Sequence, residues 1–162
     1  KQFKEYKQYE GSYKDTPFMP YGGSIKSIGC SITSVSIVLT GYGIDVNPGD
    51  LAGHAGLSLH LKTYGVNSSE NKDFGINNSE SNAIADNITN HLKNGQPVVV
   101  EISGDLKAGG ATKHYDQHFI TVLDINSSGE VYVSDPGSST TNGWANVYDI
   151  VGISKNVIYT EN

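Results

Sequence analysis

Arginine is absent from this 162-residue sequence: all eleven basic residues are lysine, and the formal net charge is −6. Bidentate recognition of phosphate or guanine depends on the guanidinium group, so this composition argues against a nucleic-acid partner. A single cysteine excludes an intramolecular disulfide. No apolar run is long enough to span a membrane. These absences leave a protein whose contacts with its partners do not depend on strong positive charge.

The length predicts a single domain over residues 1–162, with residues 1–20 as a tyrosine-rich arm packed on it. Abundant Tyr, Asn, Ser and Gly indicate a polar surface rich in loops, which suits a protein that faces an extracellular polymer. Because the sequence begins at Lys1 rather than Met, we expect it to be part of a larger exported protein whose signal lies upstream.

The only cysteine, Cys30, stands directly before an apolar stretch of helical length. Ile32, Val35 and Leu39 recur at helical spacing, which predicts a helix that begins at or near Cys30. Unpaired N–H groups and the positive end of the helix dipole favour a thiolate at such a position. Gly29 leaves room beside the sulfur for a substrate backbone. The alternative is a buried structural cysteine, which is common among free cysteines.

Helices are expected mainly in the first half of the chain and strands in the second, which predicts an α+β fold with an antiparallel sheet. A surface loop is expected over residues 66–80, a helix over 82–94 and a flexible connection over 104–113. Strands are expected over residues 97–102, 118–125, 130–134, 147–153 and 156–159, with a hairpin turn at 126–129.

The predicted hairpin places a histidine beside a carboxylate. If its turn pairs Ile125 with Glu130, then Asp135 lies opposite Ile120, and His118 becomes its diagonal neighbour on the same face. Diagonal pairs are about 7–8 Å apart at the backbone, within reach of an imidazole–carboxylate hydrogen bond. Such a carboxylate fixes the tautomer of the ring and stabilises the imidazolium.

Other residues compete for these roles. His114, with Asp116 beside it, could serve as the base, although it lacks a rigid strand beneath it. Asp124 also shares the predicted face of His118, and Asp135 before proline could simply start a turn. Gln8 is the one candidate in the arm, because a side-chain amide can donate to an oxyanion; the alternative is an ordinary surface glutamine.

Four segments, in this order, resemble blocks of the C39-like cysteine peptidases of the papain-like superfamily. They are Gly29-Cys30-Ser31-Ile32-Thr33-Ser34, Gln96-Pro97-Val98-Val99-Val100, His118-Phe119-Ile120-Thr121-Val122 and Val133-Ser134-Asp135-Pro136. The resemblance implies a papain-like fold, in which an N-terminal nucleophile helix packs on an antiparallel β-sheet. It also implies that Cys30 is the nucleophile, His118 the base, Asp135 the orienting acid and Gln8 the oxyanion donor. Ser31-Ile32 departs from the Gly-Pro often found after the cysteine.

The implied activity is hydrolysis of peptide bonds through a thioester acyl-enzyme, with no metal or organic cofactor. We expect an exported or cell-surface bacterial enzyme that acts on peptidoglycan peptides or on proteins. Two alternatives remain open: an acyl transferase of the transglutaminase type, which uses Cys, His and Asp in the same chain order, and a catalytically inactive papain-like binding module.

Overall fold

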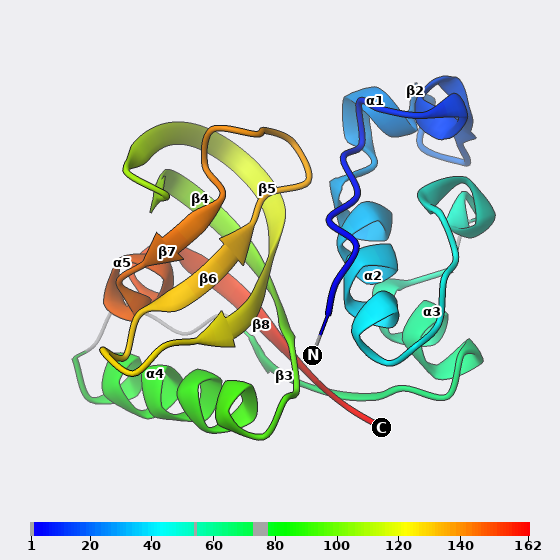
Figure 1. Cartoon of the computed structure of the whole chain (residues 1–162). Coiled ribbons are helices and arrows are strands. Elements are labelled where there is room, and N and C mark those ends of the chain that lie inside the picture. The colour runs from blue at the N-terminus through cyan, green and yellow to red at the C-terminus, as the bar shows by residue number, and fades with distance from the viewer. Residues whose placement is uncertain (1, 54, 73–77) are drawn as a thin grey trace.

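A computed structural model describes residues 2–53, 55–72 and 78–162 (Figure 1). Its main feature is a six-stranded sheet with the order β3-β8-β4-β5-β6-β7, in which every neighbouring pair is antiparallel. In sequence order, the strands are β3 (Asn67–Lys72), β4 (Val98–Ala108), β5 (Ala111–Ile125), β6 (Val131–Ser134), β7 (Gly143–Ala145) and β8 (Ser154–Glu161). The predicted α+β class with an antiparallel sheet is therefore confirmed.

Helices surround this sheet, and a separate two-stranded ribbon lies beside α1 (Figure 1). The α-helices are α1 (Ile25–Ile28), α2 (Cys30–Gly41), α3 (Leu57–Thr63), α4 (Asn78–Lys93) and α5 (Val147–Val151). Two 3₁₀ turns, η1 (Ser12–Asp15) and η2 (Pro48–Leu51), and the ribbon strands β1 (Pro17–Phe18) and β2 (Gly23–Ser24) complete the described elements.

The sheet is buried on both faces by helices of different parts of the chain. Val98 and Val100 of β4 belong to a core with α4 and α5, whereas Val99 belongs to a second core with α2. This alternation follows from the period of two along a strand. The burial of α2 extends beyond the apolar face predicted from the sequence, because Ile37 packs against Tyr6 of the arm in a third cluster.

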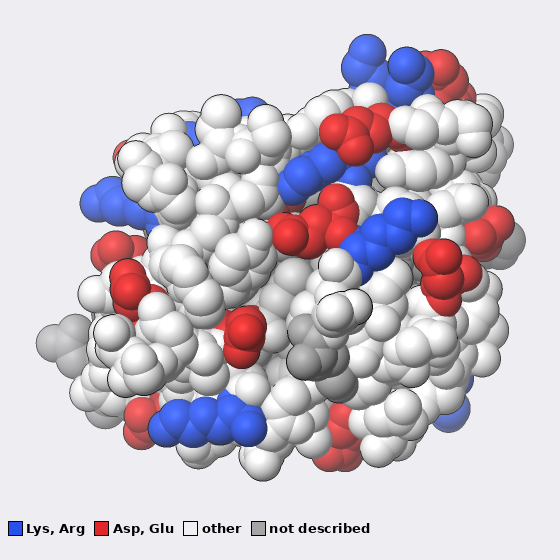
Figure 2. Space-filling model, in the orientation of Figure 1, with Lys and Arg blue, Asp and Glu red and all other residues white. Residues whose placement is uncertain are grey.

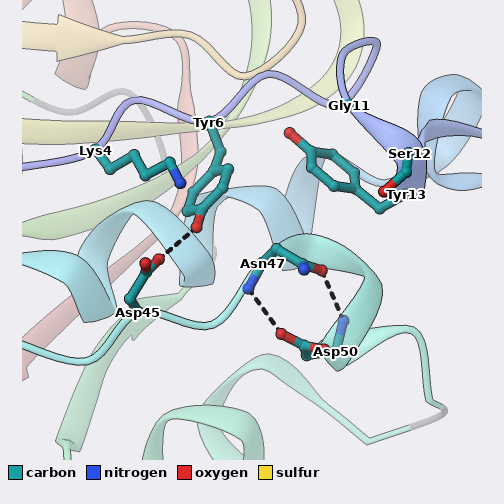
Figure 3. Close-up of a pocket in the computed structure, with 8 residues that line it drawn as sticks. All are labelled: Lys4, Tyr6, Gly11, Ser12, Tyr13, Asp45, Asn47 and Asp50. Carbon is teal, nitrogen blue, oxygen red and sulfur yellow. Dashed lines mark hydrogen bonds between the residues drawn. The ribbon is translucent and has the colours of Figure 1, made fainter.

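The arm lies along α2, and one hollow beside it is shown in Figure 3. The hydroxyl of Tyr6 donates to Asp45, which follows α2, over 2.5 Å. The ammonium group of Lys4 lies 4.6 Å from the centroid of the Tyr6 ring. Below them, Asn47 and Asp50 cap η2 through reciprocal hydrogen bonds between side chain and backbone (Figure 3). The bond from Tyr6 to Asp45 thus ties the arm to the segment that follows α2.

Three local predictions were wrong. Within the loop predicted over residues 66–80, residues 67–72 form the edge strand β3 and residues 78–80 begin α4, while residues 73–77 lie outside the described residues. Residues 147–151 form α5 rather than a strand. Asn146 caps α5 by accepting a hydrogen bond from the Tyr148 N–H, and Val147, Ile150 and Val151 recur at the spacing that buries one helical face. A short apolar run does not by itself separate a helix from a strand.

The third error concerns residues 104–113, which form a tight hairpin instead of a flexible connection. The strands β4 and β5 pair as far as Ala108 and Ala111, leaving only Gly109 and Gly110 in the turn. Both glycines have positive φ angles of 60° and 77°, as a two-residue hairpin turn requires. The Gly109 N–H donates to the carbonyl of Trp144 in β7 over 3.0 Å, so the turn packs against that strand.

This packing predicts different effects for two neighbouring substitutions. A Cβ on Gly109 would overlap the carbonyl oxygen of Asn142, whereas a Cβ on Gly110 would meet nothing within 4 Å. Gly110→Ala should cost only the left-handed backbone penalty of about 1–2 kcal/mol. Gly109→Ala should cost about 1–3 kcal/mol more, because the backbone at Asn142 must shift. Urea denaturation of both variants tests this; equal losses would contradict the packing.

Candidate active site

Cys30 is the first residue of α2, and a break at Gly29 separates it from α1. A Cβ on Gly29 would lie 2.5 Å from the carbonyl oxygen of Ile25 and 2.7 Å from its Cα. Glycine is therefore required by the backbone of α1, in addition to any room that it leaves for a substrate. Because α2 begins at Cys30, the Cys30 N–H has no hydrogen-bond partner within α2.

Gln8 of the arm lies against this break. Its Nε2 donates over 3.1 Å to the carbonyl of Lys26. In a continuous helix this carbonyl would instead accept from the Cys30 N–H, four residues later. The side chain is buried, and its Oε1 has no hydrogen-bond partner among the described residues. The Gln8 N–H also donates to the carbonyl of Pro136 over 2.9 Å. The surface-glutamine alternative is thus wrong, and Gln8 links α1 to the loop after β6.

Cys30, His118 and Asp135 lie in contact although they are far apart in sequence. His118 Nε2 and Asp135 Oδ1 are 2.7 Å apart, and Cys30 is close enough to the same imidazole to raise its pKa. Because Nε2 faces the carboxylate, Nδ1 is the ring nitrogen left for Cys30. All three side chains are buried: Cys30 is 8%, His118 5% and Asp135 0% exposed.

Hydrogen bonds saturate the Asp135 carboxylate. Besides the imidazole, Oδ1 accepts from the Gly137 N–H over 2.8 Å. Oδ2 accepts from the hydroxyls of Tyr115 over 2.7 Å and Thr141 over 2.6 Å. The Asp135 N–H donates to Asn142 Oδ1 over 2.7 Å. A buried carboxylate needs such donors, because an unpaired buried charge is strongly unfavourable.

These contacts shift the pKa values of the pair in the direction of an ion pair. Burial acts to lower the pKa of His118, but hydrogen bonds to Asp135 and Cys30 outweigh it and raise the pKa to about 8. Burial acts to raise the pKa of Asp135, but the hydrogen bonds from His118, Thr141 and Tyr115 keep that pKa below its usual value. At neutral pH the site therefore favours an imidazolium beside a carboxylate.

A lysine of the arm lies on the other side of Asp135. Lys7 Nζ donates to the Asp135 carbonyl and to Asn142 Oδ1, both over 2.7 Å. Its side chain is 8% exposed, and burial lowers its pKa. Lys7 and Asn142 thus fix the backbone of the acidic residue, while other groups fix its carboxylate.

The hairpin of β5 and β6 places Asp135 at the predicted register, although its strand pairing differs from the prediction in two ways that cancel. Ile125 pairs with Val131 rather than with Glu130, so the turn is one residue longer than predicted. Leu123 then forms a bulge, after which Val122 pairs with Val133. Asp135 consequently follows β6 at the position opposite Ile120, as expected.

The competing residues lie elsewhere. His114 is exposed and lies between two carboxylates, with Nδ1 2.7 Å from Asp105 and Nε2 3.1 Å from Asp116. Asp124 is exposed, and its Oδ1 accepts from the N–H of Ile125. The structure therefore brings together Cys30, His118, Asp135 and Gln8 and none of their competitors; the catalytic roles of these four residues stay a prediction.

Five supporting residues were not found from the sequence: Lys7, Tyr115, Gly137, Thr141 and Asn142. Gly137 is required because a Cβ there would lie 2.8 Å from His118 Cε1. The one available signal was the cluster of small and hydroxyl-bearing residues after Pro136, which favours a loop that folds back on itself.

Within residues 2–53, 55–72 and 78–162, no group of three or more His, Cys, Asp or Glu side chains is placed to bind a metal ion. No helix in the same ranges combines the length and the apolarity needed to cross a bilayer. On the face shown in Figure 2, lysines and acidic residues are interspersed, without one continuous positive area.

Comparisons with known proteins concern the family and the fold. The model of the peptidase C39-like family matches residues 1–161. A crystal structure of the peptidase domain of Streptococcus ComA, a bi-functional ABC transporter involved in a quorum-sensing pathway, matches with a TM-score of 0.54 and 13% identity. The match covers 81% of this chain and 89% of that one, and supports the predicted papain-like fold. A search of curated proteins found no significant match.

The pKa of His118 can be measured directly. In ¹⁵N-histidine-labelled protein, we expect the His118 ring to titrate with a midpoint near 8, above the ordinary 6.5, because Asp135 and Cys30 stabilise its charge. Asp135→Asn should move the midpoint to 6.5 or below, since the burial penalty remains without the carboxylate. His60, whose pKa is lowered by burial, serves as the internal control. A wild-type midpoint at or below 6.5 would contradict the ion pair.

Proposed function

The chain belongs to the peptidase C39-like family and is a cysteine peptidase, and from this premise we propose that it cleaves peptide bonds through a triad of Cys30, His118 and Asp135. The observation that carries the proposal is one imidazole, buried between the only cysteine and a fully hydrogen-bonded carboxylate. A nucleophile, a base and a group that orients the base are the parts that this chemistry requires.

In the first step, the Cys30 thiolate attacks the scissile carbonyl carbon and its negative charge moves to the carbonyl oxygen. The Cys30 N–H and the Gln8 amide are the donors that we assign to this oxyanion. The His118 imidazolium then gives its proton to the leaving amine, and the carbon–nitrogen bond breaks to leave a thioester. His118, now neutral, takes a proton from water, and the water oxygen attacks the thioester carbon. The carbon–sulfur bond then breaks, which releases the acid and restores the Cys30 thiolate beside the His118 imidazolium.

The proposed substrates are peptide bonds of peptidoglycan or of proteins outside the cell, cleaved by an exported or cell-surface bacterial enzyme. Support comes from the family and from the polar composition, rich in Tyr, Asn, Ser and Gly. A cysteine peptidase with a single thiol has no structural disulfide to lose, so it is compatible with either redox compartment.

Alkylation of Cys30 tests the triad. In the wild type, we expect rapid reaction with iodoacetamide below pH 7, because the imidazolium stabilises the thiolate. His118→Ala should abolish this rapid phase and leave a rate that rises only near the ordinary thiol range of about 8.5. The measurement is the rate of Cys30 modification by intact-protein mass spectrometry at several pH values.

The matched control is His114→Ala, which removes an exposed imidazole that is also paired with carboxylates. It should leave the alkylation profile unchanged. A wild-type rate that rises only near pH 8.5 and does not respond to His118 would sink the triad and favour the binding-module alternative.

Product analysis separates hydrolysis from acyl transfer. We expect the protein to release new carboxyl termini from peptides or from isolated cell-wall sacculi, with no incorporation of a labelled primary amine. Cys30→Ala should lower kcat/KM by about 10³-fold or more, because no other group can form the thioester. Mass spectrometry of the products provides both readouts.

In the same assay, a product that carries the labelled amine would show that the thioester is resolved by amines, as in the transglutaminase-type alternative. Cleavage of a denatured protein but not of sacculi would overturn the cell-wall substrate while retaining the peptidase. Equal activity of Cys30→Ala would overturn the nucleophile.

A further inference from the structure

Tyr115 contacts both members of the His118–Asp135 pair. Its ring lies parallel to the imidazole of His118, with 3.8 Å between the centroids and 8° between the planes. Its hydroxyl donates to Asp135 Oδ2 over 2.7 Å. Among the described residues, no other side chain both stacks on the His118 ring and hydrogen-bonds to the Asp135 carboxylate.

A β-bulge produces this arrangement. Residues three apart on a regular strand point to opposite faces, so Tyr115 and His118 should not meet. In the pairing of β4 with β5, however, Ile102 pairs with His118 and Gly104 with Tyr115, which leaves two residues of β5 opposite Ser103. The extra residue reverses the alternation, and the two rings fall on the same side of the strand.

The two contacts restrict different movements. The stacked ring covers one face of the imidazole, while the Asp135 hydrogen bond fixes its Nε2 edge. The Tyr115 and Thr141 hydroxyls fill Oδ2, so the carboxylate cannot turn that oxygen toward His118 without losing both donors. Burial, and to a smaller extent the hydrogen bond to Asp135, raise the pKa of Tyr115. The hydroxyl therefore stays protonated and remains a donor throughout the neutral pH range.

We propose that Tyr115 is a positioning residue of the catalytic site: its ring sets the plane of the His118 imidazole, and its hydroxyl sets the orientation and the effective charge of Asp135. The proposal deepens the proposed function and rests on the triad. Tyr115 acts through His118 and Asp135 and does not need to touch the substrate.

The groups around the His118–Asp135 pair determine how the titration midpoint of His118 responds to a change at Tyr115. Cys30 faces His118 from α2, and Lys7 of the arm donates to the Asp135 carbonyl. The Lys113 ammonium lies 5.2 Å from the centroid of the Tyr115 ring. With these groups unchanged, loss of the Tyr115 hydroxyl leaves more negative charge on Asp135 to stabilise the imidazolium. The titration midpoint of His118 should therefore move upward, and its proton should transfer less readily to the leaving amine.

Two substitutions separate the hydroxyl from the ring. Tyr115→Phe keeps the stack and removes one donor, and should lower kcat about tenfold with KM unchanged while the NMR midpoint of His118 rises. Tyr115→Leu removes both, and should lower kcat about 10²-fold and slow Cys30 alkylation at pH 6, because the imidazole loses its fixed plane. Peptide hydrolysis and ¹⁵N-histidine titration are measured on the same samples.

Two further variants serve as controls. Thr141→Val removes the other hydroxyl donor to Oδ2 without affecting the stack, and should raise the His118 midpoint as Tyr115→Phe does. Tyr148→Phe changes an exposed tyrosine and should leave every readout at the wild-type value. Thermal unfolding verifies that each variant folds; if Tyr115→Leu does not, the kinetics and titration of Tyr115→Phe decide the proposal.

The outcomes distinguish this proposal from the triad on which it rests. If His118→Ala keeps peptidase activity, the triad itself is wrong. If His118→Ala abolishes activity but Tyr115→Phe and Tyr115→Leu both retain wild-type kcat and His118 titration, only the role of Tyr115 is overturned. Equal kcat values for Tyr115→Phe and Tyr115→Leu would overturn the contribution of the ring.

Discussion

Burial of the Asp135 carboxylate is the constraint that organises this site. Its exposed fraction is 0%, and a charge in that environment is tolerated only when its oxygens are fully hydrogen-bonded. His118 and Gly137 bind one oxygen, and Tyr115 and Thr141 bind the other. The hydrogen bonds that stabilise the buried charge also fix the orientation of the carboxylate and, through it, of the imidazole. Stability of the pair and orientation of the ring therefore have the same structural origin.

The segments that satisfy Asp135 come from opposite ends of the sequence. Lys7 reaches the backbone of Asp135 from the arm, and Gln8 connects the following proline to α1. Asn142 accepts from both Lys7 and Asp135, and the turn at Gly109 packs against Asn142. The loop that follows β6 and carries Asp135 and Asn142 is therefore supported by the arm on one side and by the β4–β5 hairpin on the other.

Sequence patterns predicted the fold class and placed His118 beside Asp135, because helical spacing and strand alternation are local properties. Only the family resemblance joined Cys30 to this pair. The register of Asp135 came out as predicted only because the bulge at Leu123 compensated for a longer turn. The role of Tyr115 could not be predicted, since a second bulge reverses the alternation on which such reasoning depends. Bulges result from tertiary packing, and neither left a clear mark in the composition of the strand.

The bond between Lys7 and Asp135 joins residues separated by 128 positions, and loops of that length close late during folding. A chain that is still being synthesised carries Cys30 long before it carries His118, Asp135 or the loop that Lys7 supports. Thiol, base and acid meet only when the arm and the second half of the sequence are both in place. The fold thus brings Cys30 and His118 together only after residues from both ends of this sequence have packed against each other.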